Sequence, residues 1–121
     1  MGLEYKFYYL KNKLFPNWDL NQEWKITNSH KMIQEIKNKI DSKFIGYCDR
    51  ESKTICLDLH EDEWKIDMII VHEICHTFSN CNTHGKLWNN KMIKVSDRCD
   101  KLNDYRLADQ IRHELENYEL V

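Results

Sequence analysis

The sequence predicts one α+β domain that spans residues 1–121. Two short runs rich in β-branched and aromatic residues, "KFIGYCD" and "KTICLDLH", are separated only by the polar residues "RES" and predict an antiparallel hairpin. Beyond this hairpin the chain carries three successive segments with helical patterns. Strands followed by a run of helices are typical of α+β folds. The expected order is a strand, a helix, two strands and three helices.

The N-terminal third of the chain predicts a strand, a loop and a helix. Bulky residues alternate in "LEYKFYY" (3–9), which favours a strand with one face formed by Leu3, Tyr5, Phe7 and Tyr9. Pro16 in "FPNWDLNQ" excludes a helix interior and predicts a loop. Asn28 or Ser29 is suited to cap an amphipathic helix that runs to about residue 40. Its apolar positions are Met32, Ile33, Ile36 and Ile40.

The C-terminal half predicts three helices. "EDEWKIDMIIVHEICHTFSN" is apolar on most sides and predicts a buried helix, opened by Asp62 or Glu63 and ended by Asn80. After a turn at Asn82 and Thr83, "HGKLWNNKMIKV" begins a second helix. A third is expected over about 104–118. Its apolar stripe consists of Ala108, Ile111, Leu115 and Tyr118.

Composition excludes several classes of protein. A net charge of -2 provides no basic field, so we expect neither direct nucleic-acid binding nor attachment to an anionic membrane. No stretch approaches the length of a membrane span, and the N-terminus lacks the pattern of a signal peptide. The five cysteines form no CxxC pair, which excludes a zinc ribbon and a thioredoxin-like motif and favours reduced thiols. We therefore expect a cytoplasmic protein. With 121 residues, of which 41% are hydrophobic, the chain can form a single hydrophobic core.

The segment "HEICHTFSNCNTHGKLW" (72–88) carries the chemistry of this chain. His72 and His76 are one helical turn apart, so both imidazoles project from the same face and can reach one Zn²⁺. Glu73 is rotated off this direction, so it can hydrogen-bond a zinc-bound water without ligating the metal. A catalytic zinc lowers the pKa of that water to about 7. The expected roles are zinc ligands for the two histidines and general base for Glu73.

A third ligand has two candidate sources. His84, followed by Gly85, lies within reach after a short loop. The alternative is an acidic ligand further along the chain, from among Asp97, Asp100, Asp104 and Asp109. A fourth ligand from Cys81 would make the site a structural His₃Cys site. We expect a catalytic site, because a structural one has no need of Glu73.

The segment "IVHEICHTFSNCNTHGKLW" resembles the active site of the SprT-like zinc metalloproteases, over roughly residues 53–95. In that family HExxH is followed by a short loop, His-Gly and an aromatic residue. The resemblance implies that His72, His76 and His84 bind zinc and that Glu73 is the general base, with Trp88 as the aromatic residue. It also implies a small zincin-like domain, with a short antiparallel sheet packed on the HExxH helix and two further C-terminal helices. The preceding "TICLDL" would be the edge strand along which a peptide substrate pairs.

The function implied is that of a zinc-dependent endopeptidase, in which a zinc-bound water attacks a peptide carbonyl with the help of Glu73. The chain departs from larger SprT-like proteins in having no zinc ribbon, and Ser79 and Asn82 exclude the metzincin pattern. We expect a narrow protein substrate, because little surface lies beyond the core. Two alternatives remain: a zinc-stabilised binding or inhibitor module, of a kind that mobile elements encode, and an ImmA/IrrE-like peptidase with an acidic third ligand.

Residues outside the motif have simpler interpretations. Cys75 is expected to be a buried structural thiol, and His60 a solvated strand end. Tyr105 and Arg106 are candidate donors for the tetrahedral intermediate of the reaction. "HELEN" (113–117) repeats His-Glu, but its fifth residue is asparagine where the motif has its second histidine. We expect it to be solvated surface.

Overall fold

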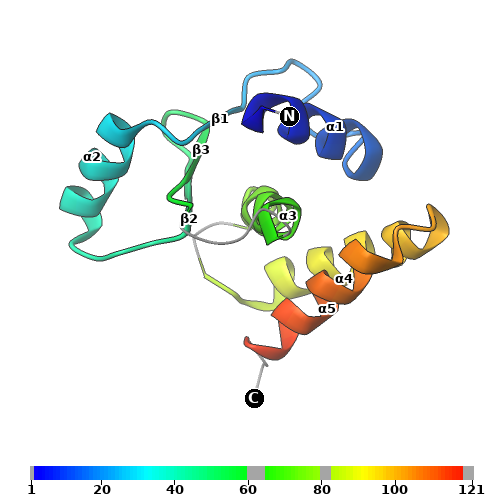
Figure 1. The fold of residues 1–121 in the computed structure, drawn as a ribbon. Coiled ribbons are helices and arrows are strands. Elements are labelled where there is room, and N and C mark those ends of the chain that lie inside the picture. Colours follow the sequence, from blue (N-terminus) through cyan, green and yellow to red (C-terminus); the bar gives the residue numbers. More distant parts are fainter. Residues whose placement is uncertain (1, 60–64, 80–82, 119–121) are drawn as a thin grey trace.

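Helix α3 lies at the centre of the fold, between a small sheet on one side and the two C-terminal helices on the other (Figure 1). The structure is a computed structural model that describes residues 2–59, 65–79 and 83–118. In these ranges the chain forms α1 (Leu3–Leu14), β1 (Lys25–Thr27), α2 (His30–Ile40), β2 (Gly46–Asp49), β3 (Thr54–Leu57), α3 (Ile66–His76), α4 (Lys86–Lys101) and α5 (Tyr105–Glu116). The predicted α+β class is confirmed.

The first element is a helix, so the strand predicted over 3–9 is wrong. The buried residues of α1 are Phe7, Leu10, Lys11 and Leu14, which recur at helical spacing. Tyr5 and Tyr9, assigned to the same face of a strand as Phe7, are exposed on α1. The alternation over seven residues is too short to exclude a helix whose inward face continues to residue 14. Packing of that face against α3 and β1 decides the conformation.

The sheet is mixed, and its strand order is β1-β3-β2. The predicted hairpin of β2 and β3 is confirmed as antiparallel, with Cys48 paired to Ile55. Strand β1, which the sequence pattern did not predict, pairs in parallel with β3. The expectation that "TICLDL" forms an edge strand is therefore wrong, because β3 has a hydrogen-bonded neighbour on both sides. The edge nearest α3 belongs to β2.

The other predicted helices are present. Ser29 caps α2 by accepting a hydrogen bond from Met32 N, and Asp104 caps α5 in the same way with Leu107 N. Helix α3 ends at His76, with Thr77 as its C-cap, and not at Asn80. The predicted opening at Asp62 or Glu63, together with Asn80 and Asn82, lies outside the described residues.

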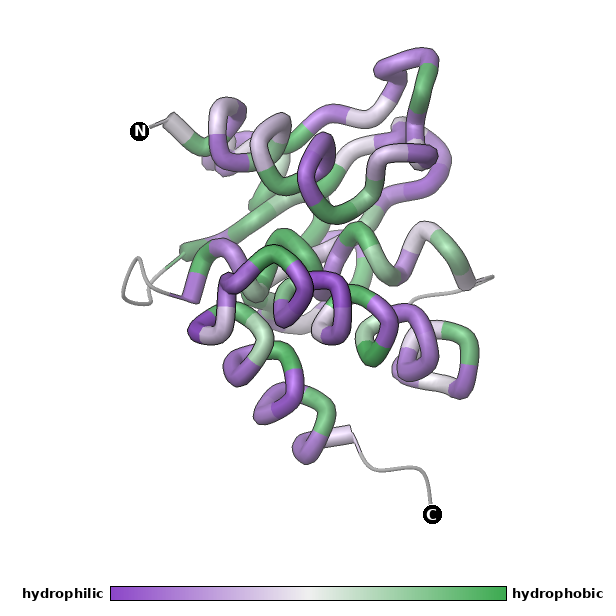
Figure 2. The backbone as a smooth tube through the Cα atoms, turned by 90° about the vertical axis from the view of Figure 1, so that its right-hand side faces the viewer, coloured by the Kyte–Doolittle hydropathy of each residue, from purple (hydrophilic) through white to green (hydrophobic). Residues whose placement is uncertain are grey.

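The main core surrounds α3. Figure 2 shows hydrophobic residues concentrated in the strands and the interior helix, whereas the outer helices alternate between hydrophilic and hydrophobic turns. From Ile69 to His76 every residue of α3 is buried, which places the histidines and Glu73 inside the molecule. Among the described helices, none is both long and apolar enough to cross a bilayer.

Candidate metal centre

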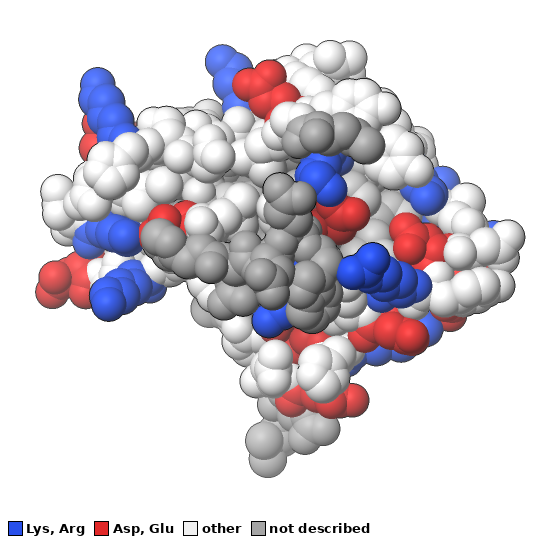
Figure 3. All heavy atoms as spheres, in the orientation of Figure 1, with Lys and Arg blue, Asp and Glu red and all other residues white. Residues whose placement is uncertain are grey.

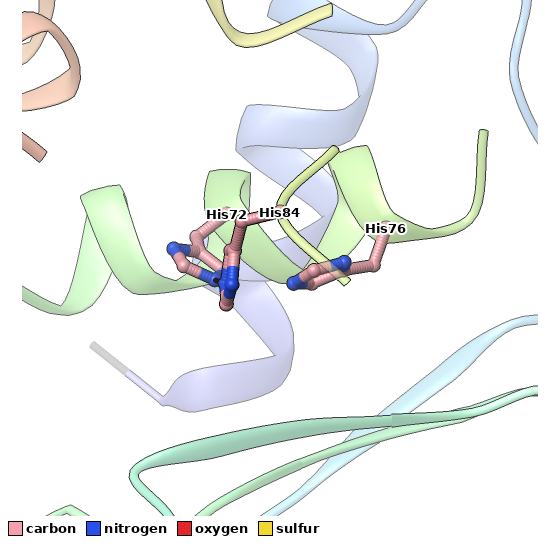
Figure 4. Close-up of side chains that lie close together, drawn as sticks. All are labelled: His72, His76 and His84. Atoms are coloured by element: carbon pink, nitrogen blue, oxygen red, sulfur yellow. Dashed lines mark hydrogen bonds between the residues drawn. The ribbon is translucent and has the colours of Figure 1, made fainter. Parts of the chain in front are cut away.

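Three histidines converge where α3 meets the start of α4. His72 and His76 lie one turn apart on α3, and His84 immediately precedes Gly85, the N-cap of α4. Each contributes one ring nitrogen to a group whose atoms all lie within 4.8 Å of one another. The Nε2 atoms of His72 and His84 are 3.0 Å apart, and in Figure 4 the ring of His76 points toward this pair. The structure thus brings together the three residues that the sequence selected.

Trp88 packs against the rings of all three histidines. Its side chain is fully buried, and its indole centroid lies 4.8 Å, 5.7 Å and 4.6 Å from the ring centroids of His72, His76 and His84. The indole Nε1 also donates a hydrogen bond to the backbone oxygen of His72, at 3.2 Å. This bond and the packing fix the first turn of α4 against α3. Trp88 therefore sets the position of His84 relative to the other two histidines.

The glycine after His84 is not required by steric crowding. The φ of Gly85 is -82°, a value that any residue can adopt. A Cβ there would meet only Thr83 Oγ1, at an ordinary 3.8 Å. The close approach in this site is at Gly46 instead.

The histidine cluster suits a metal ion electronically. Burial, followed by repulsion from the neighbouring imidazoles, lowers the pKa of His76 to about 3 and that of His84 to about 4. Both rings are therefore neutral at neutral pH, with a lone pair free to bind a cation. Three imidazoles with an open position match the donor set of catalytic zinc. The residues present fit the ion.

Glu73 lies beside this cluster and is buried. Its Oε2 is 3.8 Å from Nε2 of His72, on the side of the ring that faces His84. Burial raises the pKa of Glu73 to about 7; the charge of His72 acts in the opposite direction. The carboxylate also lies directly against β2, where a Cβ on Gly46 would be 2.7 Å from Oε2. Glycine at 46 leaves the room that the carboxylate occupies.

The end of helix α5 and the residues just after it contribute two side chains that sequence reasoning missed, Glu114 and Tyr118. Glu114 Oε2 lies 3.5 Å from Nδ1 of His72, and Tyr118 stacks on His84 with a centroid distance of 3.7 Å. The expectation that "HELEN" is solvated surface holds for His113, whose side chain is exposed and pairs with Glu116. It is wrong for Glu114, whose side chain is only 14% exposed. The apolar stripe of the last predicted helix, which includes Tyr118, was the signal in the sequence that this segment faces inward.

A cleft of about 1040 Å³ opens onto the cluster. Its floor is the face of α3 that carries Met68, His72 and His76. One wall is formed by residues 44–47, which lead into β2, and the other by the C-terminal end of α5. The histidines and Glu73 are therefore accessible to a molecule bound between β2 and α5.

The other sequence candidates lie elsewhere. Asp97 and Asp100 pair with Arg112, and Asp104 caps α5. Asp109 is exposed, and none of these four aspartates joins the histidine group.

Tyr105 is also exposed, with its hydroxyl donating to Asn103, and the exposed Arg106 does not line the cleft. Neither Tyr105 nor Arg106 is therefore the donor predicted for the site. Cys75 is fully buried, as expected, and burial raises the pKa of its thiol. His60 and Cys81 lie outside the described residues.

Charged residues of both signs are interspersed on the face shown in Figure 3. Among the described residues visible there, lysines and arginines form no continuous basic area. Comparisons of the chain with models of protein families, with curated proteins and with solved structures find no match. Function must therefore be inferred from the residues of the site.

Proposed function

We propose that this protein is a zinc-dependent endopeptidase of the SprT-like, zincin-like kind. The observation that carries the proposal is the placement of Glu73 beside three converging histidines at the floor of an open cleft. A site that serves only to hold the fold has no use for a buried carboxylate on its open side, nor for a cleft that leads to it.

In the proposed reaction the histidines bind the metal ion and Glu73 transfers the proton. His72, His76 and His84 would hold the ion, which when bound supplies a Lewis acid that activates water and polarises a peptide carbonyl. Glu73 would accept a proton at Oε2 as the water attacks, and would then donate it to the leaving amine. A pKa near neutrality, which burial provides, suits a group that must both take and release a proton.

The substrate would bind as an extended segment along β2. This strand is an edge of the sheet and lines the cleft, so its outer side is the available place for main-chain pairing. Phe44 and Met68 add apolar side chains to the cleft. Specificity would then come from strand pairing and a few contacts with side chains, which supports a narrow protein substrate.

The alternative is a zinc-stabilised binding or inhibitor module, which would need the histidines but not Glu73. An ImmA/IrrE-like site with an aspartate as the third ligand receives less support, since the four candidate aspartates lie apart from His72 and His76. The substitution Glu73→Gln separates the peptidase from the module. It keeps the shape of the side chain and removes its ability to take up a proton.

The test combines metal analysis with a comparison of cellular proteins. Purified protein should contain about one zinc per chain. Cells that express the wild type should show a specific cleaved protein that is absent with Glu73→Gln and present with the control Glu116→Gln, an exposed residue. Protein without any tightly held transition metal would refute the zinc site. A zinc-loaded protein that retains its biological effect with Glu73→Gln would establish the binding module instead.

A further inference from the structure

We propose that Glu114 is a positioning residue for the metal centre: its carboxylate accepts the Nδ1–H of His72 and thereby directs Nε2 of that ring toward the ion. The inference rests on the histidine site of the proposed function. It does not depend on whether that site cleaves peptides.

The two nitrogens of His72 face different partners. Nε2 lies 3.0 Å from Nε2 of His84 and 3.8 Å from Oε2 of Glu73, so it is on the side where the ion would bind. Nδ1 lies 3.5 Å from Oε2 of Glu114. The imidazole is thus placed between two carboxylates, one on the metal side and one behind. Only the carboxylate behind the ring can fix its tautomer without competing for the ion.

This arrangement is the usual one for metal-ligating histidines. The second ring nitrogen donates to a carboxylate or carbonyl, which orients the ring, places the proton on that nitrogen and increases the basicity of the ligand. The 3.5 Å separation is roughly half an ångström beyond an ordinary N–H···O bond. A small rotation of either side chain would close it.

Glu114 is itself held for this role. Its side chain is 14% exposed, and its other oxygen, Oε1, accepts a hydrogen bond from Asn117 Nδ2 at 3.1 Å. One oxygen is therefore held by the C-cap residue of the same helix, and the other faces His72. Neighbouring residues of α5 pack into the main core through Leu107, Ala108 and Ile111. The carboxylate consequently approaches α3 on a helix that is anchored in the main core.

Neither His76 nor His84 has a carboxylate contact of this kind in the described structure. The Nδ1 atom of His76 is buried without a hydrogen-bond partner there, and the closest ring on His84 is that of Tyr118. Orientation by an anionic partner is therefore concentrated on His72. Removal of Glu114 should weaken the hold of the whole site on its ion.

The experiment measures the affinity for Zn²⁺ by competition with a chromophoric chelator. Glu114→Ala should bind Zn²⁺ about 10- to 100-fold more weakly than the wild type, the range found when such partners are removed. Glu114→Gln should lie between the two, because its amide oxygen still accepts a hydrogen bond. The matched control is Glu116→Ala on the same helix, which removes an equal charge from an exposed side chain and should leave the affinity unchanged.

A second readout separates positioning from a general loss of structure. Co²⁺ bound in place of Zn²⁺ has visible absorption bands that report the geometry of its ligands, and Glu114→Ala should shift them while Glu116→Ala should not. A Glu114→Ala variant with wild-type affinity and an unchanged Co²⁺ spectrum would overturn the inference, provided that the wild type binds zinc. A loss as complete as that of His72→Ala would also overturn it, because Glu114 would then be a direct ligand. A wild type without zinc affinity would refute the proposed metal site itself.

Discussion

On the proposed mechanism, the substitution Gly46→Ala should impair catalysis without disturbing metal binding. A Cβ at this position would lie 2.7 Å from Oε2 of Glu73 and 3.0 Å from its Cδ and Cγ. Oε2 would have to withdraw to at least 3.4 Å, where ordinary contact begins. The atoms in the way belong to a side chain, so the carboxylate can move while the backbone of β2 stays in place. The histidines are not among the nearest atoms.

The magnitude follows from the sensitivity of catalysis to position. A misplacement of about 1 Å can cost on the order of 10²-fold in rate, so a displacement of this size should lower kcat/KM by roughly 10- to 100-fold. The assay is the cleavage of a peptide that spans the site cut in the cellular substrate, together with zinc content. Gly85→Ala is the matched control, since its Cβ would have only the 3.8 Å contact with Thr83 Oγ1.

Two results would refute this reasoning. Wild-type kcat/KM in Gly46→Ala would mean that the position of Glu73 does not limit the reaction. Loss of zinc in the same variant would mean that the methyl group disturbs the histidines instead of the carboxylate. In addition, Gly46→Ala should have no further effect in a Glu73→Gln background, because both changes act on the same group.

Three further predictions concern ligands, pH and substrates. His84→Ala should lose most of the zinc affinity and some thermal stability, because a bound ion would tie α3 to the start of α4, whereas Asp97→Ala should keep about one zinc per chain. In metal-free protein, only the unfolded state takes up protons at His76 and His84 as the pH falls from 6.5 toward 4, and this uptake lowers the stability of the fold. Glu73 has the opposite effect, because between pH 4.5 and about 7 it is protonated in the folded state and ionised in the unfolded state. Denaturant titrations between pH 6.5 and 4.5 should therefore show a steeper loss of stability in Glu73→Gln than in the wild type, and equal slopes would contradict the assigned shift. Casein should be cut poorly or not at all on gels, and vigorous cleavage of unrelated proteins would exclude a narrow substrate.

The sequence predicted the histidine cluster because helical periodicity determines it locally. His72 and His76 share a face by their spacing alone, and the loop that precedes Gly85 is short enough to return His84 to them. Glu114 could not be found in this way. Its place behind His72 depends on how α5 docks, which is a tertiary property that the local pattern does not contain.

The errors in the fold have a similar origin. The alternation of bulky residues over residues 3–9 fits a strand when these seven residues are considered alone. The inward face of helix α1 can be recognised only when Leu10 and Leu14 are included. Strand β1 has three residues, too few to show a period, and it pairs with β3 across α2 and β2. That distant pairing places β3 in the centre of the sheet. The identity of the edge strand was therefore beyond local inference.

The docking of α5 couples the hold on a bound metal to the position of this helix. A chain in which α5 is detached still carries His72, His76 and His84, but it lacks the carboxylate behind His72 and the ring of Tyr118 over His84. If the proposed site holds an ion, such a chain would exchange it faster than the native protein. The rate of zinc exchange would then report how often this helix opens, and a partner that pulled α5 away could release the metal without unfolding the core.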